Sequence, residues 1–242
     1  MSKPDCCKVF ANLAKKPGFD LYQIMYNQNV EIRFYLKRDP YGCFCNFAPY
    51  PVEIDGKVWK TTEHYYHAQR FAGTEFEEVI REIKTPFQAK EVAKSGIYPR
   101  RSDWFDVKFD IMMRAVTAKF NQHNELRDIL VSTGNAILKE HTGLDHYWAD
   151  GGDGSGRSRL GEILMTVRSS FPEYDGIFFE PPWEAFPTHR QDTSFWNEGT
   201  GKEYLEEFLT WCGKLSSAAK KEYERYYIMP VKWEEFKNEF HL

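Results

Sequence analysis

Apolar and polar residues alternate strictly over residues 30–36, which is the pattern of a strand with one buried face. Its predicted inward side chains are those of Val30, Ile32, Phe34 and Leu36. Two further short runs, at residues 51–54 and 57–59, flank Asp55-Gly56, a dipeptide that favours the tight turn of a β-hairpin. The pattern therefore predicts a small β component near the start of the chain.

Helical spacing of apolar residues dominates the part of the chain that follows. It predicts helices over residues 62–72, 74–83, 85–96, 102–118, 126–130 and 160–167, with a brief strand at 136–139. The predicted start signals are Thr62 and Ser102 as N-caps, Thr74 with Glu77 as a capping box, and Thr85 before Pro86.

Three segments differ in their patterns. Residues 1–28 have the spacing of a short helical lead-in, and residues 29–171 hold the strands and helices just described. Residues 172–242 begin with an irregular, proline-rich stretch and continue with helices at about 201–212 and 216–227. We expect an α+β fold: a compact, mostly helical single domain with a small β-sheet at residues 29–171, and an aromatic-rich helical extension packed on it.

Charge and cysteine usage exclude several classes of protein. The formal net charge is −4, so general attraction to nucleic acid or to an anionic membrane is not indicated, although a local basic groove stays open. The five cysteines show no zinc-finger spacing, and we expect reduced thiols and no metal. With no membrane-length apolar run and no signal-peptide pattern, we expect a cytoplasmic protein, or a nuclear one in a eukaryote, without a membrane partner.

The segment from Trp148 to Gly161 is the most distinctive local pattern. Its glycines can turn several backbone N–H groups toward one point, and the predicted helix after them presents its positive end there. Such a loop can hold a phosphate or a sugar, with Asp150 beside it as an acid, a base or an acceptor for a ribose hydroxyl. The alternatives are a flexible surface turn for the glycines and an Asx turn for Asp150.

The predicted helix at residues 62–72 presents two different faces. Helical spacing places Glu63, His67 and Arg70 on one face, and the other face comprises Tyr65, Ala68, Phe71 and Ala72. The helix dipole favours the ionised form of Glu63, which could stabilise a cationic sugar transition state or orient water. The alternative is a solvated Glu-His-Arg surface.

Each of three further side chains could have either of two roles. Trp104 lies at an amphipathic position of its helix, so it either stacks on a base or packs in the core. Lys119 and Arg114 either contact phosphate or are solvated charges on a helix surface.

Six blocks of residues agree, in order and with fitting gaps, with one known family. They are Tyr41-Gly42-x-Phe44-x-Asn46-Phe47, then Asp55-Gly56-Lys57-x-Trp59-x-Thr61-x-Glu63-His64-Tyr65-Tyr66-x-Ala68-Gln69-x-Phe71, then Trp104, then Met113-Arg114 with Ala118-Lys119-Phe120 and Gln122, then residues 148–161, and finally Leu164-Met165 with Arg168. Over about residues 30–170 the chain resembles the NADAR domain, the YbiA-like N-glycosidase superfamily.

The resemblance implies a compact, mostly helical α+β domain that cleaves a bond between ribose and nitrogen without a metal or cofactor. It implies catalytic roles for Glu63, Asp150 and Lys119. The implied substrate-binding residues are Asn46, Phe47, His67, Trp104, Trp148, Gly151, Gly152, Gly154, Gly156 and Arg157. The chain departs from the family pattern at Cys45, Arg70, Ala149 and Ser158, where Ser, Lys, Gly and Asn are usual. A mechanism that needs lysine at position 70 is therefore in doubt.

The resemblance leaves three functions open. The first is removal of ADP-ribose from the amino group of guanine in DNA or RNA, the second is hydrolysis of a phosphoribosylamino-pyrimidine intermediate of riboflavin synthesis, and the third is binding of ADP-ribose or NAD without turnover. We favour the first, because the aromatic residues after position 172 could add surface for a larger substrate. Its partner would be the ADP-ribose moiety on guanine of a nucleic acid, and protein partners are left open.

Overall fold

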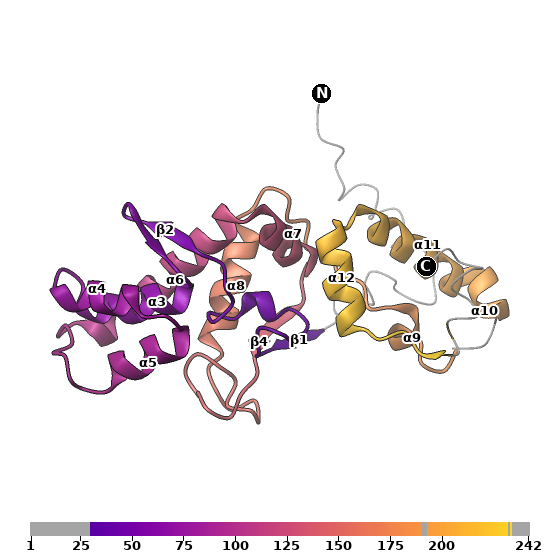
Figure 1. Cartoon of the computed structure of the whole chain (residues 1–242). Coiled ribbons are helices and arrows are strands. Elements are labelled where there is room, and N and C mark those ends of the chain that lie inside the picture. Colours follow the sequence, from indigo (N-terminus) through magenta and orange to yellow (C-terminus); the bar gives the residue numbers. More distant parts are fainter. Residues whose placement is uncertain (1–29, 190–192, 232, 234–242) are drawn as a thin grey trace. The chain divides into compact units, whose positions relative to one another are not determined.

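The computed structural model describes residues 30–189, 193–231 and 233 (Figure 1). The predicted lead-in at residues 1–28 lies outside the described residues. The chain divides into two compact units. One, here called the α+β unit, comprises Glu31–Val131 and Ile137–Tyr174; the other, here called the helical unit, includes Ser132–Ala136 and the chain from Asp175 onward.

The α+β unit contains two small sheets and six α-helices among its described residues. In chain order its elements are β1 (Glu31–Phe34), the 3-10 turn η1 (Gly42–Phe44), β2 (Val52–Ile54), β3 (Lys57–Trp59), α3 (Thr62–Ala68), η2 (Gln69–Phe71), α4 (Glu75–Glu82), α5 (Pro86–Lys94), α6 (Trp104–Gln122), α7 (Asn124–Ser132), β4 (Ile137–Glu140) and α8 (Arg159–Ser169). The expected α+β class, mostly helical with few strands, is confirmed.

Strand β1 pairs in parallel with β4, which lies more than 100 residues further along the chain, with Phe34 opposite Glu140 (Figure 1). The expected inward residues Ile32 and Phe34 are buried. Leu36 is instead 39% exposed, because the strand ends at Phe34 and the alternation no longer applies beyond it.

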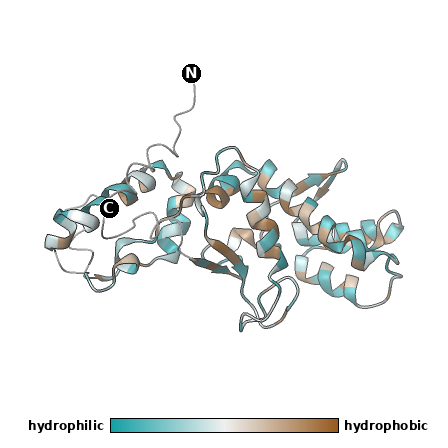
Figure 2. Ribbon diagram, turned by 180° about the vertical axis from the view of Figure 1, so that it is seen from behind, coloured by the Kyte–Doolittle hydropathy of each residue, from teal (hydrophilic) through white to brown (hydrophobic). Residues whose placement is uncertain are grey.

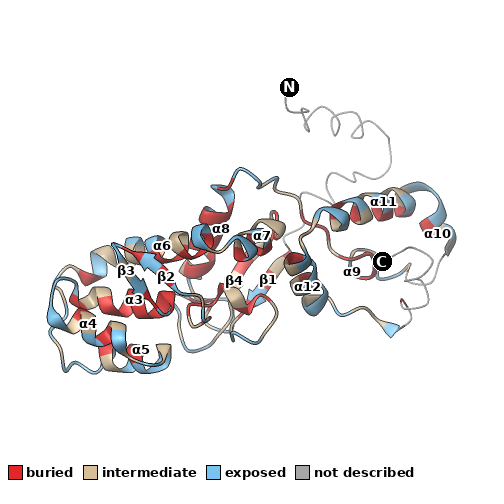
Figure 3. Cartoon of the chain, turned by 45° about the horizontal axis from the view of Figure 1, so that its top comes forward, coloured by how far each residue is buried: buried red, intermediate tan, exposed pale blue. Residues whose placement is uncertain are grey.

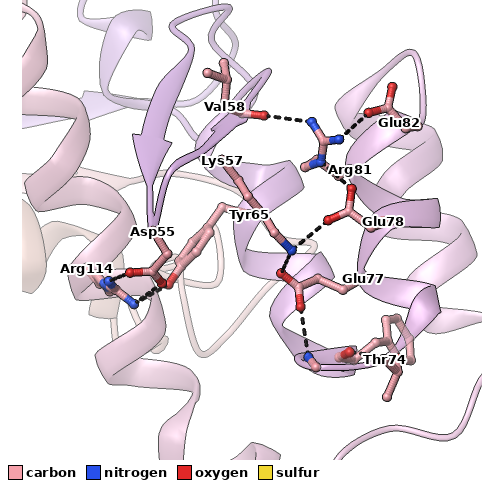
Figure 4. Close-up of polar contacts among 12 residues, drawn as sticks. Asp55, Lys57, Val58, Tyr65, Thr74, Glu77, Glu78, Arg81, Glu82 and Arg114 are labelled. Carbon is pink, nitrogen blue, oxygen red and sulfur yellow. Dashed lines mark hydrogen bonds and ion pairs between the residues drawn. The ribbon is translucent and has the colours of Figure 1, made fainter.

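The second sheet is the antiparallel hairpin of β2 and β3, as predicted. Asp55 and Gly56 both have positive φ, the conformation of a tight hairpin turn. Arg114 of α6 donates to both carboxylate oxygens of Asp55, at 2.8 and 2.5 Å, while Lys57 of β3 forms ion pairs with Glu77 and Glu78 of α4 (Figure 4). Arg114 thus fixes the hairpin on α6, and its contact with a phosphate stays a prediction.

Three predicted helix starts shift by one residue or change partner. The side chain that caps α3 is Thr61, not Thr62, and it accepts from the His64 N–H. Glu77 reaches the N–H of Gly73 rather than that of Thr74, so the predicted capping box does not form as such. The long helix α6 follows Asp103, whose side chain makes no cap bond.

Apolar side chains from the hairpin and from helices α3 to α6 form the core of this unit. The core residues include Val52, Ile54, Trp59, Tyr65, Ala68, Phe71, Ile80, Ala89, Ala93 and Ala115. Brown and teal residues alternate along most helices in Figure 2, as expected of amphipathic helices with one buried side. Helix α3 differs, because all seven of its residues are buried although four of them are polar (Figure 3).

The helical unit consists of α9 (Pro182–Ala185), α10 (Thr193–Asn197), α11 (Gly199–Lys214) and α12 (Ser217–Tyr226). Its aromatic side chains form a core of their own, in which Phe178, Phe179, Trp183, Trp196, Tyr204, Phe208, Trp211, Tyr223 and Trp233 are buried. The hydroxyls of Tyr204 and Tyr223 donate to the carbonyls of Glu180 and Phe179. These aromatic rings are core, so they do not supply the extra substrate surface that we expected of the extension.

None of the helices in the described part of the chain combines the length and the apolar character needed to span a membrane.

Candidate active site

A cavity of about 710 Å³ lies within the α+β unit. The residues that follow β1 and those at the end of β4 line it, together with α3, α5, the start of α6 and residues 142–148. The cavity is thus at the carboxyl ends of the two parallel strands, which is where parallel sheets generally bind ligands. Of the predicted site residues, Asn46, Phe47, Glu63, His67, Trp104 and Trp148 line it.

Glu63 and His67 form the polar centre of α3. Glu63 lies in the first turn of the helix, 7% exposed, and its backbone N–H donates to the carbonyl of Asn46 at 3.2 Å. His67, one turn later, donates from Nε2 to Glu63 Oε1 at 2.9 Å. Burial lowers the pKa of His67 and outweighs the raising effect of Glu63, so the ring is neutral at pH 7 and the contact is a hydrogen bond rather than an ion pair. Its Nδ1 is buried with no partner among the described residues.

The other histidine of this helix has a structural role. His64 Nε2 donates to the carbonyl of Ile83 at 3.1 Å, and its Nδ1 is 2.8 Å from the hydroxyl of Thr61. Both ring nitrogens are therefore used to fasten the start of α3 to the end of α4. Glu63 and His67 line the cavity, as the predicted helix face requires, and so does Arg70. Tyr66 of α3 also lines the cavity, while Tyr65, Ala68 and Phe71 lie in the core. Ala72, expected beside them, is exposed because the helix has ended.

Aromatic rings form one wall of the cavity. Tyr66 lies between Trp104 and Trp148, with ring centroids 5.0 and 5.5 Å away, and the Trp148 Nε1–H donates to the Tyr66 hydroxyl at 3.2 Å. The guanidinium of Arg70 lies 4.6 Å from the Trp104 ring. Trp104 is buried in the packing, and its side chain also lines the cavity. Its stacking on a base stays a prediction.

Asn46 is fixed where the cavity meets the start of α3. Its Oδ1 accepts from the hydroxyl of Thr62 at 2.9 Å, and its Nδ2 is 3.3 Å from the sulfur of Met112. Phe47, the next residue, has the ammonium of Lys90 5.8 Å from its ring.

Basic side chains outnumber acidic ones in the cavity wall. Seven lysines and arginines line it, namely Lys37, Arg38, Arg70, Lys90, Lys94, Arg100 and Lys108, against the acids Glu63, Glu140 and Asp145. Within the described ranges, Arg70, Lys90, Lys94, Arg100 and Lys108 form no salt bridge. Burial lowers the pKa of Lys94, the charges of Lys90 and Arg70 lower it further, and Asp145 and Glu63 oppose this effect. The cavity suits an anionic ligand although the whole chain is acidic.

Asp150 does not line the cavity. It is 2% exposed, with Oδ2 accepting from His141 Nδ1 at 2.7 Å and Oδ1 accepting from the Gly152 N–H at 2.9 Å. Burial raises the pKa of Asp150, but these hydrogen bonds outweigh it and bring the net pKa below its ordinary value. Its backbone N–H donates to the carbonyl of Glu140. The carboxylate thus joins the glycine loop to the end of β4.

The glycine loop does not reach the cavity either: Gly151, Gly152, Gly154, Gly156 and Arg157 are all absent from its wall. Several of its N–H groups donate within the protein: those of Gly156, Arg157 and Ser158 bond to the carbonyls of Asp150, His146 and Ala149. These three N–H groups are therefore not directed at a ligand, in contrast to the phosphate-holding loop that we expected from the sequence. The loop instead supports the segment of residues 145–148, of which Asp145, Tyr147 and Trp148 line the cavity.

Close packing explains why glycine is needed in this loop. A Cβ on Gly156 would lie 2.4 Å from the carbonyl oxygen of Ala149, whereas one on Gly154 would meet nothing within 4 Å. We expect Gly156→Ala to lower the free energy of unfolding by about 1–3 kcal/mol, the typical cost of forcing atoms into a packed region. Gly154→Ala, the matched control, carries only the cost of positive φ, about 1 kcal/mol. Thermal unfolding of both variants tests this, and equal losses would contradict it.

Lys119 lies apart from the cavity, fully buried. Its Nζ donates to the carbonyls of Cys43 and Cys45, at 2.5 and 3.0 Å, and burial lowers its pKa to about 8. The contacts that the structure shows for Lys119 thus position the segment before Asn46 and do not include the cavity.

Glu140 and the basic residues of α5 and α6 were not predicted as site residues. Glu140 ends a predicted strand as a polar residue, and strand alternation places it on the same face as the buried Leu138, a signal that could have found it. The lysines and arginines are spread over residues 37–108, and only the fold brings them together. No group of three or more His, Cys, Asp and Glu side chains in the described part of the chain could hold a metal.

The α+β unit thus holds a cavity that combines a helix-borne Glu–His pair, aromatic rings and cations, and this cavity is the candidate active site. The chain belongs to the NADAR domain family, whose model matches residues 33–171. The family resemblance inferred from the sequence is confirmed.

Relatives and one solved structure agree with this assignment. The N-glycosidase YbiA of Escherichia coli (strain K12) is 45% identical over 141 residues, which cover 58% of this chain and 88% of YbiA. An N-glycosidase of Nostoc punctiforme is 39% identical, covering 57% of this chain and 90% of its own. A riboflavin biosynthesis protein of Vibrio vulnificus is 34% identical, covering 72% and 49%. The NMR structure of E. coli YbiA superimposes with a TM-score of 0.55, covering 59% of this chain and 84% of that structure.

Proposed function

We propose that this chain is an N-glycosidase that hydrolyses the bond between ribose and the amino group of guanine, releasing ADP-ribose from nucleic acid. The observation that carries the proposal is the cavity, in which Glu63 and His67 lie among aromatic rings and unpaired cations. The similarity to N-glycosidases supports the reaction class.

Each group in the cavity has a role in this reaction. Cleavage of a ribose–nitrogen bond develops positive charge on the sugar, and the carboxylate of Glu63 can stabilise that charge or take a proton from the attacking water. His67 holds this carboxylate in place. The rings of Trp104 and Tyr66 offer a surface for a base.

The spread of the cations supports a substrate with more than one phosphate. Lys37 and Arg38 follow β1, Lys90 and Lys94 lie on α5, and Lys108 lies on α6. Charges on three separate segments can contact a pyrophosphate along its length.

Exposed apolar residues at the cavity support a nucleic-acid substrate. Phe87 and Phe105 are 62% and 64% exposed, and Arg100 lies 4.5 Å from the Phe105 ring. Aromatic rings beside cations are typical of surfaces that stack unpaired bases and hold their phosphates. They offer contacts to nucleotides next to the modified guanine.

The second candidate is the phosphoribosylamino-pyrimidine of riboflavin synthesis. It is favoured by the similarity to a protein named for riboflavin biosynthesis. Its sugar carries one phosphate, which part of the cationic wall would satisfy. The third reading, binding without turnover, is disfavoured by the buried Glu63–His67 pair, because a binding module has no need of that arrangement.

The test offers three ligands in parallel to the purified full chain: an oligonucleotide with ADP-ribosylated guanine, the phosphoribosylamino-pyrimidine, and free ADP-ribose. We expect ADP-ribose to be released from the oligonucleotide, and free ADP-ribose to bind measurably in calorimetry. The Glu63→Gln protein, prepared identically, controls for contaminating activity.

Each other outcome of this test is informative. Turnover of the phosphoribosylamino-pyrimidine alone would contradict the proposal and favour the second candidate, a hydrolase of riboflavin synthesis. Binding of ADP-ribose with no hydrolysis of either substrate would show a binding module.

A further inference from the structure

A second carboxyl group lines the cavity. Glu140 is the last residue of β4, where strand alternation places it on the same face as Leu138. Leu138 is fully buried, whereas the Glu140 side chain borders the cavity. The inward face of the strand thus ends in a carboxyl group at the cavity wall.

No described residue neutralises this carboxyl. Glu140 forms no hydrogen bond or ion pair through its side chain within the described part of the chain, in contrast to Asp150, which has two such partners. The charged groups that act on it are Glu63 of α3, Lys90 of α5, and Asp145 and Asp150 of the following loop. Three of these four are acids, so a proton on Glu140 relieves repulsion among them.

We propose that Glu140 is the proton donor of the reaction, and that it protonates the nitrogen that leaves the ribose. This inference rests on the proposed N-glycosidase function. Two carboxyl groups at one cavity, one protonated and one ionised, are the pair that glycoside hydrolysis generally requires. Glu63, held by His67, is the ionised partner.

The proton balance of the step is complete. The bond between ribose C1′ and nitrogen breaks, its electron pair goes to the nitrogen, and that nitrogen takes the proton from the Glu140 carboxyl. Water adds to C1′ and gives a proton to the Glu63 carboxylate. Return of that proton to Glu140 through solvent restores both groups, so the net reaction consumes one water.

The segment after β4 holds Glu140 in position. The Asp150 N–H donates a hydrogen bond to the Glu140 carbonyl at 2.9 Å, and the His141 N–H donates one to the Phe34 carbonyl at 2.9 Å. The Asp150 carboxylate accepts a hydrogen bond from the His141 ring. Asp150 is therefore a positioning residue, which acts on the reaction through the end of β4 although it lies outside the cavity.

The electrostatics of the site agree with this role. Burial raises the pKa of Glu140 to about 8, with a further increase from Glu63, Asp145 and Asp150 and an opposing effect of Lys90. An acid with this pKa is mostly protonated at pH 7 and loses its proton as the pH rises through 8. We therefore expect kcat/KM to fall above about pH 8.

The test compares two leaving groups in Glu140→Gln. With an N-riboside, whose departing nitrogen needs a proton, we expect kcat to fall by about 10²–10⁴ and the alkaline limb of the pH profile to disappear. With 4-nitrophenyl riboside 5-phosphate, whose phenolate leaves without a proton, we expect kcat within about threefold of the unmodified chain. Glu53→Gln, an exposed glutamate of β2, is the control and changes neither rate.

The possible outcomes distinguish a failure of the proposed role of Glu140 from a failure of the proposed N-glycosidase function. An equal loss on both leaving groups, or an alkaline limb that persists in Glu140→Gln, would overturn the role of Glu140 alone. Glu140→Asp keeps an acid at this position, so a slower enzyme with the alkaline limb retained is expected even if the glutamine variant folds poorly. An unmodified chain inactive on every riboside would overturn the proposed function, and the inference with it.

Discussion

Replacing Glu63 by glutamine is expected to lower kcat by about 10²–10⁴, the range typical of losing an acid–base group. Glutamine is nearly the same size and its Oε1 can still accept from His67 Nε2, so α3 should keep its geometry. The substitution removes only the negative charge and the ability to take a proton. Steady-state kinetics with the ADP-ribosylated oligonucleotide, together with thermal unfolding, measure the two effects separately.

A matched control is available on the next helix. Glu75 lies in the first turn of α4, as Glu63 does in α3, but it is exposed and outside the cavity. Glu75→Gln should leave kcat unchanged. If Glu63→Gln turns over at a rate close to that of the control, the carboxylate of Glu63 has no part in the chemistry.

The second large effect is expected in binding. Lys90→Gln combined with Lys94→Gln removes two cations of the cavity wall that form no salt bridge. Charged hydrogen bonds contribute about 1.5–3 kcal/mol each, so KM should rise at least 10-fold while kcat stays constant. The same variant should bind free ADP-ribose more weakly, and its binding should depend less steeply on salt concentration.

Lys84→Gln serves as the control, because Lys84 is exposed and outside the cavity. A KM that rises equally in both variants would indicate a general loss of charge attraction rather than a contact in the cavity. An unchanged KM in the double variant would contradict the assignment of these lysines to the phosphates.

Much of the fold, and the part of the site that lies on α3, follow from local sequence patterns. The period of residues 62–71 separates the Glu63–His67 face from the face of Tyr65 and Phe71, and the structure has both where the pattern puts them. The periodic spacing of side chains along a helix depends only on local sequence. Helix α3 therefore keeps the two predicted faces although all of its residues are buried. The Asp55-Gly56 turn is local in the same way.

The remainder of the site depends on contacts between distant segments. Glycine content alone does not reveal whether N–H groups point to a ligand or to carbonyls of residues 146–150, and here those of Gly156, Arg157 and Ser158 point to the carbonyls. The lysines and arginines of the cavity wall come from five segments of the chain that have no common motif. Lys119 is a polar residue on an apolar helix stripe, and only its partners, the carbonyls of Cys43 and Cys45, show why it is buried.

The parallel pairing of β1 with β4 has a consequence for the order of folding. The two strands are separated by more than 100 residues. Closing so long a loop costs conformational entropy before the contacts between β1 and β4 can offset it. The hairpin and helices between them can form from local contacts as the ribosome releases them. The cavity cannot, since its floor includes the end of the last strand. A growing chain therefore acquires helices α3 to α7 before its binding site, and a product that stops before β4 contains the Glu63 helix but lacks one wall of the cavity.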